Sequence, residues 1–319
     1  MKNSNKRIHG HTIDEIRNLL QSTCDYVQKD LVLDTSSLGG WSNINIQGTS
    51  EGRKIVLKLP WSIVHFDSNP YLELNKLLTY LSKSKLATPP IAIGRLPDRN
   101  ETPFMLLHYL DGKILSSLLD ASRDELLALK STLQELSYQK PPGLRKYATP
   151  FDYFTEYYDE IVNHKFLSKG SKEVLSLVSE FRDCCTKLSP KIEMLEEWSR
   201  TLMHGDLWEP NILFQDGKVC LLDFELSSYG DPIYDLAYLL EAQERPLADK
   251  FPDVLYAECL QRVNSYRPVA LIALISWSLD RLLYMDAGHV EPSLGTPTIK
   301  KNMLRYTHAK MSRLASITN

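Results

Sequence analysis

The chain has 319 residues, of which 43% are hydrophobic and 24% are charged, a composition typical of globular proteins. A formal net charge of −3 and scattered Lys and Arg residues argue against a nucleic-acid partner. The N-terminus is polar and basic, and the longest apolar run, 269–279, is shorter than the roughly 20 residues of a membrane span. We therefore expect a cytoplasmic protein with no membrane partner, whose five cysteines are core thiols.

The first third of the chain predicts a small sheet, because short β-rich runs are separated by Gly, Ser, Asp or Pro. These runs are 31–33, 43–47, 54–59 and 104–109. One helix is expected at 71–83, where leucines recur at helical spacing before Pro89 and Pro90. Residues 1–109 are therefore predicted to form a first lobe, with one helix packed on the sheet.

The remainder, residues 110–319, is predicted to form a second, mostly helical lobe. The expected helices are 124–138, 151–166, 172–198, 232–242, 254–264, 269–287 and 300–316. Three short strands are expected among them, 201–203, 212–214 and 218–222. Asp216-Gly217 joins the last two and favours a hairpin turn. The fold class is therefore α+β with two lobes.

The segment around these short strands carries the residue types that phosphoryl transfer requires. It reads His204-Gly205-Asp206-Leu207-Trp208-Glu209-Pro210-Asn211 and, after the hairpin, Leu222-Asp223-Phe224-Glu225. Transfer of a γ-phosphoryl group needs a carboxylate that orients the acceptor hydroxyl, and oxygen ligands that hold Mg²⁺ on the phosphates. Asp206, Asn211 and Asp223 supply this set, and the hairpin is expected to return the second carboxylate beside the other two.

These motifs resemble the aminoglycoside phosphotransferase and choline kinase superfamily, whose members carry HGDxxxxN, a strand ending in Asp-[FW]-[DE], and GDPxxDLA, here 230–237. The resemblance implies a protein-kinase-like fold, with a small antiparallel-sheet N-lobe and a mostly helical C-lobe. It also implies ATP and Mg²⁺ as cofactors and Asp206 as the catalytic base. By the same resemblance Asn211 and Asp223 ligate magnesium, and Glu225 assists a second ion.

Two residues near the motif are expected to have structural roles. His204 is one of them, since the resemblance gives it no chemical task. Asp235 begins an apolar helix, and we expect its carboxylate to hydrogen-bond the backbone of the catalytic loop.

Nucleotide-binding residues are assigned mainly by their order relative to these motifs. The segment Leu38-Gly39-Gly40-Trp41-Ser42-Asn43 resembles the family's phosphate-covering turn, although a Gly-Gly between strands is otherwise a plain hairpin turn. Lys58 closes a strand where the family has its phosphate-contacting lysine, and Glu73 is its expected partner. Both residue types otherwise occupy solvated surfaces. Residues 105–109, including Leu107 and Tyr109, resemble the hinge that meets adenine.

The acceptor is expected to be a small molecule, because 224–229 is too short for the activation segment of a protein kinase. Carboxylates and aromatic residues suited to an amine occur on the predicted helices. They are Asp152, Glu156, Asp159, Glu160, Glu241, Glu244, Asp280, Asp286 and Glu291, with Tyr153, Tyr157, Trp277 and Tyr284.

The sequence thus predicts an ATP- and Mg²⁺-dependent kinase of an amino alcohol, aminoglycoside, sugar or similar hydroxylated molecule, as a monomer or homodimer. A non-catalytic nucleotide-binding scaffold is the alternative from another class. A protein kinase is disfavoured by the short 224–229 segment.

Overall fold

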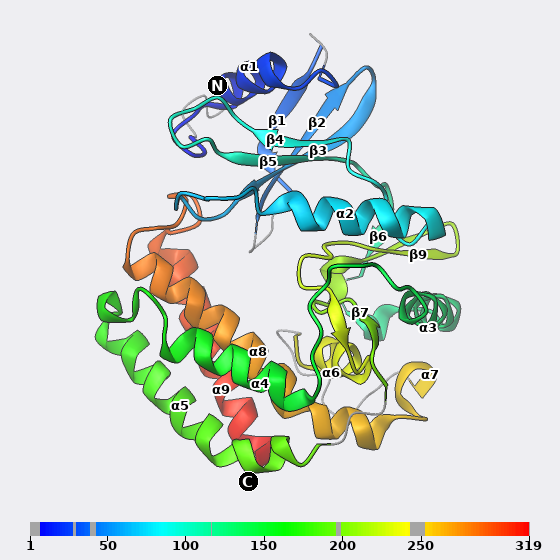
Figure 1. Cartoon of the computed structure of the whole chain (residues 1–319), viewed down its shortest axis with the longest axis vertical. Coiled ribbons are helices and arrows are strands. Elements are labelled where there is room, and N and C mark those ends of the chain that lie inside the picture. Colours follow the sequence, from blue (N-terminus) through cyan, green and yellow to red (C-terminus); the bar gives the residue numbers. More distant parts are fainter. Residues whose placement is uncertain are drawn as a thin grey trace. The chain divides into compact units, whose positions relative to one another are not determined.

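The computed structural model describes residues 7–27, 30–38, 43–115, 117–195, 199–242 and 253–318. Contacts divide the chain into two compact units. The first contains the residues up to Asp111 and the segment Gly288–Ile299, and the second contains Gly112–Ala287 and the residues from Lys300 onward. Figure 1 shows a sheet in the first unit and mainly helices in the second, which confirms the predicted α+β class.

The first unit is built on a five-stranded antiparallel sheet with the order β1-β2-β3-β5-β4. Its elements are α1 (Ile13–Thr23), β1 (Val32–Ser37), β2 (Asn43–Ser50), β3 (Arg53–Pro60), α2 (Tyr71–Leu81), a 3₁₀ turn (Ser82–Ser84), β4 (Ala92–Arg95) and β5 (Pro103–His108). The predicted helix 71–83 and strands 43–47, 54–59 and 104–109 are confirmed within a few residues. Strand β4 has no clear sequence signal, because its four residues are only half-buried and include Gly94.

Helix α1 shows that the expectation of a single helix in this unit is wrong. A capping box begins α1: Glu15 N donates to Thr12 Oγ1 at 3.2 Å, and Thr12 N donates to Glu15 Oε2 at 2.7 Å. Ile16 and Leu20 are its buried residues. The spacing T-x-x-E before these apolar positions was the available signal.

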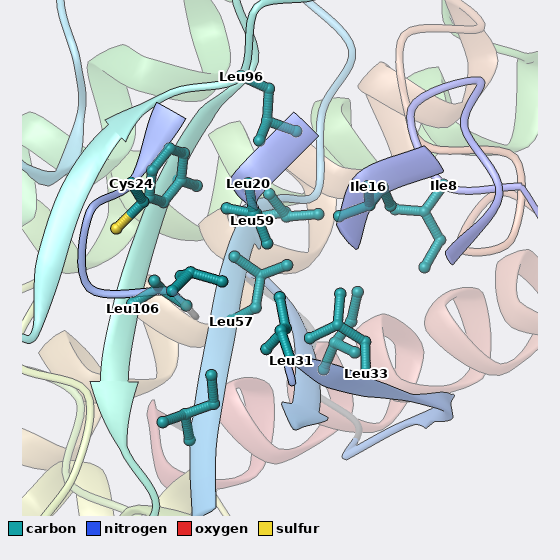
Figure 2. Packing of buried hydrophobic residues seen from close by; sticks show 14 of the residues in the cluster. Ile8, Ile16, Leu20, Cys24, Leu31, Leu33, Leu57, Leu59, Leu96 and Leu106 are labelled. Atoms are coloured by element: carbon teal, nitrogen blue, oxygen red, sulfur yellow. The ribbon is translucent and has the colours of Figure 1, made fainter. Parts of the chain in front are cut away.

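The apolar core of the first unit includes residues from α1 and one face of the sheet (Figure 2). Ile16 and Leu20 of α1 share this cluster with Leu57 and Leu59 of β3. Because successive side chains of a strand point to opposite faces, Lys58 points away from this cluster. Lys58 is nevertheless buried, opposite Met105 of β5 in the strand register.

The segment Gly288–Ile299 corrects the predicted division, which placed all of 110–319 in the second lobe. Glu291 N donates to Trp61 O at 2.9 Å, and the buried Glu291 carboxylate accepts from His9 N at 2.9 Å. Leu294 packs against the core cluster of the sheet. These partners are far apart in the sequence, so no local pattern could reveal the return of the chain.

The second unit is mostly helical, as predicted. Its elements are β6 (Lys113–Ile114), a 3₁₀ turn (Leu118–Asp120), α3 (Arg123–Ser137), α4 (Pro150–Val162), a 3₁₀ turn (Leu167–Lys169), α5 (Lys172–Glu193), β7 (Thr201–Met203), a 3₁₀ turn (Glu209–Asn211), β8 (Ile212–Gln215), β9 (Lys218–Leu221), β10 (Ser228–Gly230), α6 (Ile233–Ala242), α7 (Asp253–Tyr256), α8 (Leu260–Asp286) and α9 (Pro297–Thr318). Strand β8 pairs with β6 and β9, and β7 pairs with β10, all antiparallel. The predicted turn is confirmed, since Asp216 and Gly217 have φ of 50° and 73°.

Helix α8 is one continuous helix, whereas two helices, 254–264 and 269–287, were expected. Pro268 lies inside it and removes one backbone donor, but buried residues on both sides, such as Val263 and Leu271, keep the helix packed among α4, α5 and α6. Within the described part of the chain, α8 is the helix whose length and composition would suffice to cross a membrane. Of its most apolar window, 72% is buried, which fits a core helix of this unit.

Candidate active site

The predicted catalytic and metal-binding residues lie at the ends of the short strands in the second unit. Asp206 follows β7, Asn211 precedes β8, and Asp223 follows β9. Leu222 N donates to Asn211 O at 2.9 Å, so the hairpin brings the segment before Asp223 back to Asn211. The structure thus brings together three residues that are separated by up to seventeen positions in the sequence.

Asp206 is held by a donor from its own loop. Asn211 Nδ2 donates to Asp206 O at 2.9 Å and to Asp206 Oδ2 at 3.0 Å. Burial and the nearby Asp223 carboxylate raise the pKa of Asp206 to about 7, and hydrogen bonding opposes this rise. A carboxylate of this kind is suited to exchange a proton near neutral pH.

His204 supports the loop as a neutral side chain. Asp206 N donates to His204 Nδ1 at 3.3 Å, so the ring proton lies on Nε2, which donates to Leu222 O at 2.8 Å. Burial lowers the pKa of His204 to about 4. The imidazole ring packs on Phe224 with a centroid distance of 4.8 Å. These contacts agree with the structural role that was expected.

Asp235 binds the backbone of the catalytic loop, as predicted. Its Oδ2 accepts from His204 N at 2.7 Å, and its Oδ1 accepts from Gly205 N at 2.8 Å. Burial raises the pKa of Asp235 to about 6, and the two backbone donors oppose this shift. Helix α6 therefore fixes the chain directly before Asp206.

We expect Asp235→Asn to lower the free energy of unfolding by about 1–3 kcal/mol, because an amide offers one oxygen and leaves one buried N–H without an acceptor. Urea denaturation would measure the loss. The control is Asp124→Asn, which changes an exposed carboxylate in the first turn of α3. An equal loss in both variants would contradict the role of the two backbone hydrogen bonds.

Gly205 has a backbone conformation that other residues rarely adopt, and there is no room for a side chain at its position. Its φ is 84°, in the left-handed region. A Cβ at this position would overlap the Leu226 carbonyl oxygen and would lie 2.7 Å from the carbonyl carbon. The loop therefore passes directly against the backbone that follows β9.

The residues after β9 add further charge and one missed contact. Asp223 has φ of 61°, which is uncommon for a residue other than glycine. Glu225 is exposed and its charge also acts on Asp206. The Ser227 hydroxyl donates to His204 O at 2.9 Å. Sequence reasoning missed Ser227, because it does not belong to a motif position with an assigned role.

The donor set fits a magnesium ion. The Asn211 amide nitrogen faces two acceptors of Asp206, which leaves Asn211 Oδ1 as the atom that can ligate a metal. Asn and Asp oxygens are hard ligands, and Mg²⁺ commonly completes its octahedron with phosphates and water. Within the described ranges, no cluster of three or more His, Cys, Asp or Glu side chains could hold a metal by itself. Substrate phosphates would therefore have to supply ligands.

The predicted nucleotide residues lie in the first unit. Gly39, Gly40 and Ser42 lie outside the described residues. The buried Asn43 accepts a hydrogen bond at its Oδ1 from the Tyr71 hydroxyl at 3.0 Å. Leu107 lies in β5 opposite Val56, and Tyr109 N donates to Lys54 O at 3.2 Å. The Tyr109 N–H is thus engaged within the unit.

Glu73 does not have the position expected of a partner for Lys58. Helix α2 buries Tyr71, Leu74 and Leu77 on one face, and Glu73 lies on another. Its side chain is 65% exposed and accepts from Lys76 Nζ at 2.6 Å, one turn along the helix. The helical period therefore turns Glu73 toward solvent.

Most of the carboxylates proposed for the acceptor have structural partners. Asp152 caps α4, and Glu156 binds Arg145 and Tyr147. Glu241 binds Arg267 and Arg313, and Asp286 binds Ser171 N and Lys300. Glu291 lies in the first unit. Glu244 lies outside the described residues. Tyr153 is buried in a stack with Tyr147 and Tyr234. These residues are needed by the fold, which leaves Asp159 and Glu160 as the better candidates, together with Asp280, whose partner is the His164 ring.

These remaining carboxylates lie on α4 and α8. Asp159 and Glu160 line a groove of about 930 Å³ along α4, together with Asn163 and other residues. Burial in the groove and the charge of Asp280 raise the pKa of Glu160. Asp280 Oδ1 lies 3.0 Å from His164 Nε2 and is oriented by it. The groove is therefore lined by side chains of both charges, because Arg145 and Lys146 lie in it together with Asp159 and Glu160.

Comparison with known proteins assigns the family to which these motifs belong. Residues 37–270 match the model of the phosphotransferase enzyme family, and the chain belongs to that family. This confirms the superfamily expected from the motifs.

Among curated proteins, Protein LicA of Haemophilus influenzae is 23% identical over 237 residues, which are 72% of this chain. The match covers 64% of the length of that relative.

Solved structures with the same fold are kinases and phosphotransferases. The ethanolamine kinase of Plasmodium vivax has a TM-score of 0.65 and 14% identity, with 94% of this chain and 86% of that chain covered. The choline kinase of Cryptosporidium parvum has a TM-score of 0.61 and 14% identity, with 95% and 94% covered. Aminoglycoside phosphotransferase APH(4)-Ia, in a ternary complex with AMP-PNP and hygromycin B, has a TM-score of 0.62 and 16% identity, with 95% and 97% covered. These likenesses confirm the kinase-like fold.

Proposed function

We propose that the protein is an ATP- and Mg²⁺-dependent kinase that phosphorylates a hydroxyl group of a small molecule. The observation that carries this proposal is the convergence of Asp206, Asn211 and Asp223 at the ends of β7, β8 and β9. A carboxylate beside two oxygen ligands is the arrangement that phosphoryl transfer needs, since positioning and charge stabilisation dominate this reaction.

In this proposal Asp206 orients the acceptor hydroxyl and accepts its proton as the oxygen attacks the γ-phosphorus. Asn211 Oδ1 and Asp223 hold magnesium, which supplies charge neutralisation on the phosphates when bound. Glu225 would assist a second ion. The neutral His204 and the Asp235 carboxylate hold the loop so that Asp206 keeps its direction.

We propose ATP as the nucleotide, supported by family membership and by the residues of the first unit. Lys58 is buried on β3, where a lysine can meet phosphate oxygens without competition from bulk water. Asn43, Leu107 and Tyr109 remain proposed nucleotide contacts, as do Gly39, Gly40 and Ser42. The AMP-PNP in the complex of APH(4)-Ia supports an adenine nucleotide for this fold. An ATP requirement also favours a cytoplasmic location.

The acceptor is proposed to be a small cation or neutral polyol rather than a peptide. Strand β10 begins at Ser228, so the passage from Asp223 offers little length for a peptide platform. The carboxylates Asp159 and Glu160 in the groove can accept hydrogen bonds from an ammonium group or from hydroxyls. Choline and ethanolamine, after which two of the structural relatives are named, and hygromycin B, present in the complex of APH(4)-Ia, are the first candidates.

A transfer assay tests the proposal directly. The purified chain, ATP and Mg²⁺ would be incubated with choline, ethanolamine, hygromycin B, sugars and thiamine, and ADP release would be measured. We expect one acceptor class to raise ADP release well above the rate without acceptor. Nucleotide binding without transfer to any acceptor would favour the non-catalytic scaffold, and efficient transfer to a protein alone would contradict a small acceptor.

We expect Asp223→Ala to weaken binding of Mg²⁺-AMP-PNP more than Asn211→Ala does, because a carboxylate offers a full negative charge to a hard divalent ion. Calorimetric titration in Mg²⁺ and in excess EDTA would separate metal-dependent from metal-independent binding. The difference between the two variants should disappear in EDTA. Unchanged affinity of the Asp223 variant in Mg²⁺ would place the metal site elsewhere.

A further inference from the structure

The β9–β10 segment, residues 222–227, is hydrogen-bonded to His204 at both of its ends. At the first end, His204 Nε2 donates to Leu222 O at 2.8 Å. At the second end, the Ser227 hydroxyl donates to His204 O at 2.9 Å in a buried contact. Asp223, a proposed metal ligand, lies between the two contacts. One residue of the catalytic loop therefore binds both ends of the segment that carries this ligand.

We infer that Ser227 is a positioning residue for phosphoryl transfer, whose hydroxyl holds the β9–β10 segment on the catalytic loop and so keeps Asp223 in a fixed position relative to Asp206. This inference rests on the proposed function, because it assumes that Asp223 holds magnesium and that Asp206 handles the acceptor hydroxyl. It adds a residue that acts through the backbone of the loop and that contacts neither metal nor substrate in the proposal.

The segment and the loop are also packed together between these two hydrogen bonds. The Phe224 ring packs on the His204 imidazole with a centroid distance of 4.8 Å, and a Cβ at Gly205 would overlap the Leu226 carbonyl oxygen. Ser227 N donates to Phe224 O at 3.2 Å, which closes a turn within the segment. The Ser227 hydroxyl then ties the end of this turn to the loop.

The position of Asp223 needs such support for two reasons. Its φ of 61° lies in the left-handed region, where a residue other than glycine is strained and stays only if the surrounding contacts fix it. The charge of Asp223 also acts on the buried Asp206 carboxylate, and like charges repel. The hydrogen bond of Ser227 therefore holds the segment against both strain and repulsion. Small misplacements of reacting groups are costly, about 10²-fold for 1 Å.

The binding test compares Ser227→Ala with Ser228→Ala, using AMP-PNP and calorimetry in Mg²⁺ and in excess EDTA. Ser228 is a matched control, because it is the adjacent residue, is also buried, and has its hydroxyl 3.2 Å from the Tyr153 hydroxyl. We expect Ser227→Ala to weaken binding about 3- to 10-fold in Mg²⁺, the range for losing one hydrogen bond, and to leave binding in EDTA unchanged. Ser228→Ala should bind as wild type does under both conditions.

The kinetic test uses the same variants with ATP and choline, ethanolamine or hygromycin B. We expect Ser227→Ala to lower kcat about 10-fold or more, and Ser228→Ala to lower it less than about threefold. Both variants should lower Tm similarly, because each loses one buried hydrogen bond. If wild type is active and the two variants behave alike, or if Ser227→Ala loses affinity equally in Mg²⁺ and in EDTA, the inference fails while the proposed function stands.

A structural measurement tests the same inference without nucleotide or acceptor. Crystal structures of wild type and of both serine variants would give the position of Asp223 relative to Asp206. We expect the β9–β10 segment to move away from His204 in Ser227→Ala and to stay in place in Ser228→Ala. An unchanged segment in Ser227→Ala would overturn the inference even if no transfer had been observed.

Discussion

The variant Asp206→Asn is expected to lose phosphoryl transfer almost completely and to keep its affinity for Mg²⁺-AMP-PNP. An amide has nearly the same shape but cannot accept the proton of the acceptor hydroxyl. Groups that act as general bases contribute typically 10²–10⁴-fold, so kcat should fall by about 10²-fold or more. ADP release with the preferred acceptor would measure the rate, and calorimetry would measure nucleotide affinity.

Asp216→Asn is the control for the replacement of a carboxylate by an amide. Asp216 is an exposed carboxylate in the turn between β8 and β9, and Asn tolerates its left-handed backbone conformation. The control removes the same charge from the adjacent hairpin and should keep the wild-type kcat. If Asp206→Asn retained most of its kcat, Asp206 would have no part in the proposed mechanism.

Gly205→Ala is expected to have the second large effect, on both stability and activity. The added methyl group would overlap the Leu226 carbonyl, and alanine at φ of 84° carries an additional backbone strain of about 1–2 kcal/mol. Backbone atoms cannot move aside as a flexible side chain can, so we expect a total loss above about 4 kcal/mol in the free energy of unfolding. Any folded protein that is recovered should show a displaced Asp206 and a kcat lowered by at least about 10²-fold.

Gly217→Ala separates the two causes of that loss. Gly217 also has a left-handed backbone, with φ of 73°, but a Cβ there would meet no atom within 4 Å. This variant should lose only the strain, about 1–2 kcal/mol, and keep its kcat. Urea denaturation of both variants measures the difference. Similar losses in the two proteins would show that the Leu226 contact is unimportant.

The geometry of the catalytic loop was largely predictable, because its determinants are close together in the sequence. The Asp216-Gly217 turn requires left-handed backbone conformations. This turn determines which residues of β8 pair with which residues of β9. Asp235 could be assigned to the loop backbone because a carboxylate beginning an apolar helix needs N–H donors. Ser227 could not be assigned, since a single serine after a strand has the same signature as an ordinary polar loop residue.

Other features depended on contacts that local patterns do not contain. Pro268 signals a helix end, yet packing on both sides of it outweighs the lost hydrogen bond in α8. Glu73 was assigned by its order along the chain, whereas the helical period of α2 determines its direction. The sequence could identify candidate carboxylates for the groove. It could not separate those in salt bridges from those that face a ligand, because both kinds have the same sequence signature.

The return of Gly288–Ile299 to the first unit has a consequence for how the protein is made. A chain emerging from the ribosome completes the sheet strands by His108, but the hydrogen bonds of Trp61 O and His9 N to Glu291 can form only when Glu291 has been synthesised. By then almost the entire second unit has also been synthesised. A fragment that ends at Asp111 would lack the segment that supplies these hydrogen bonds to the first unit.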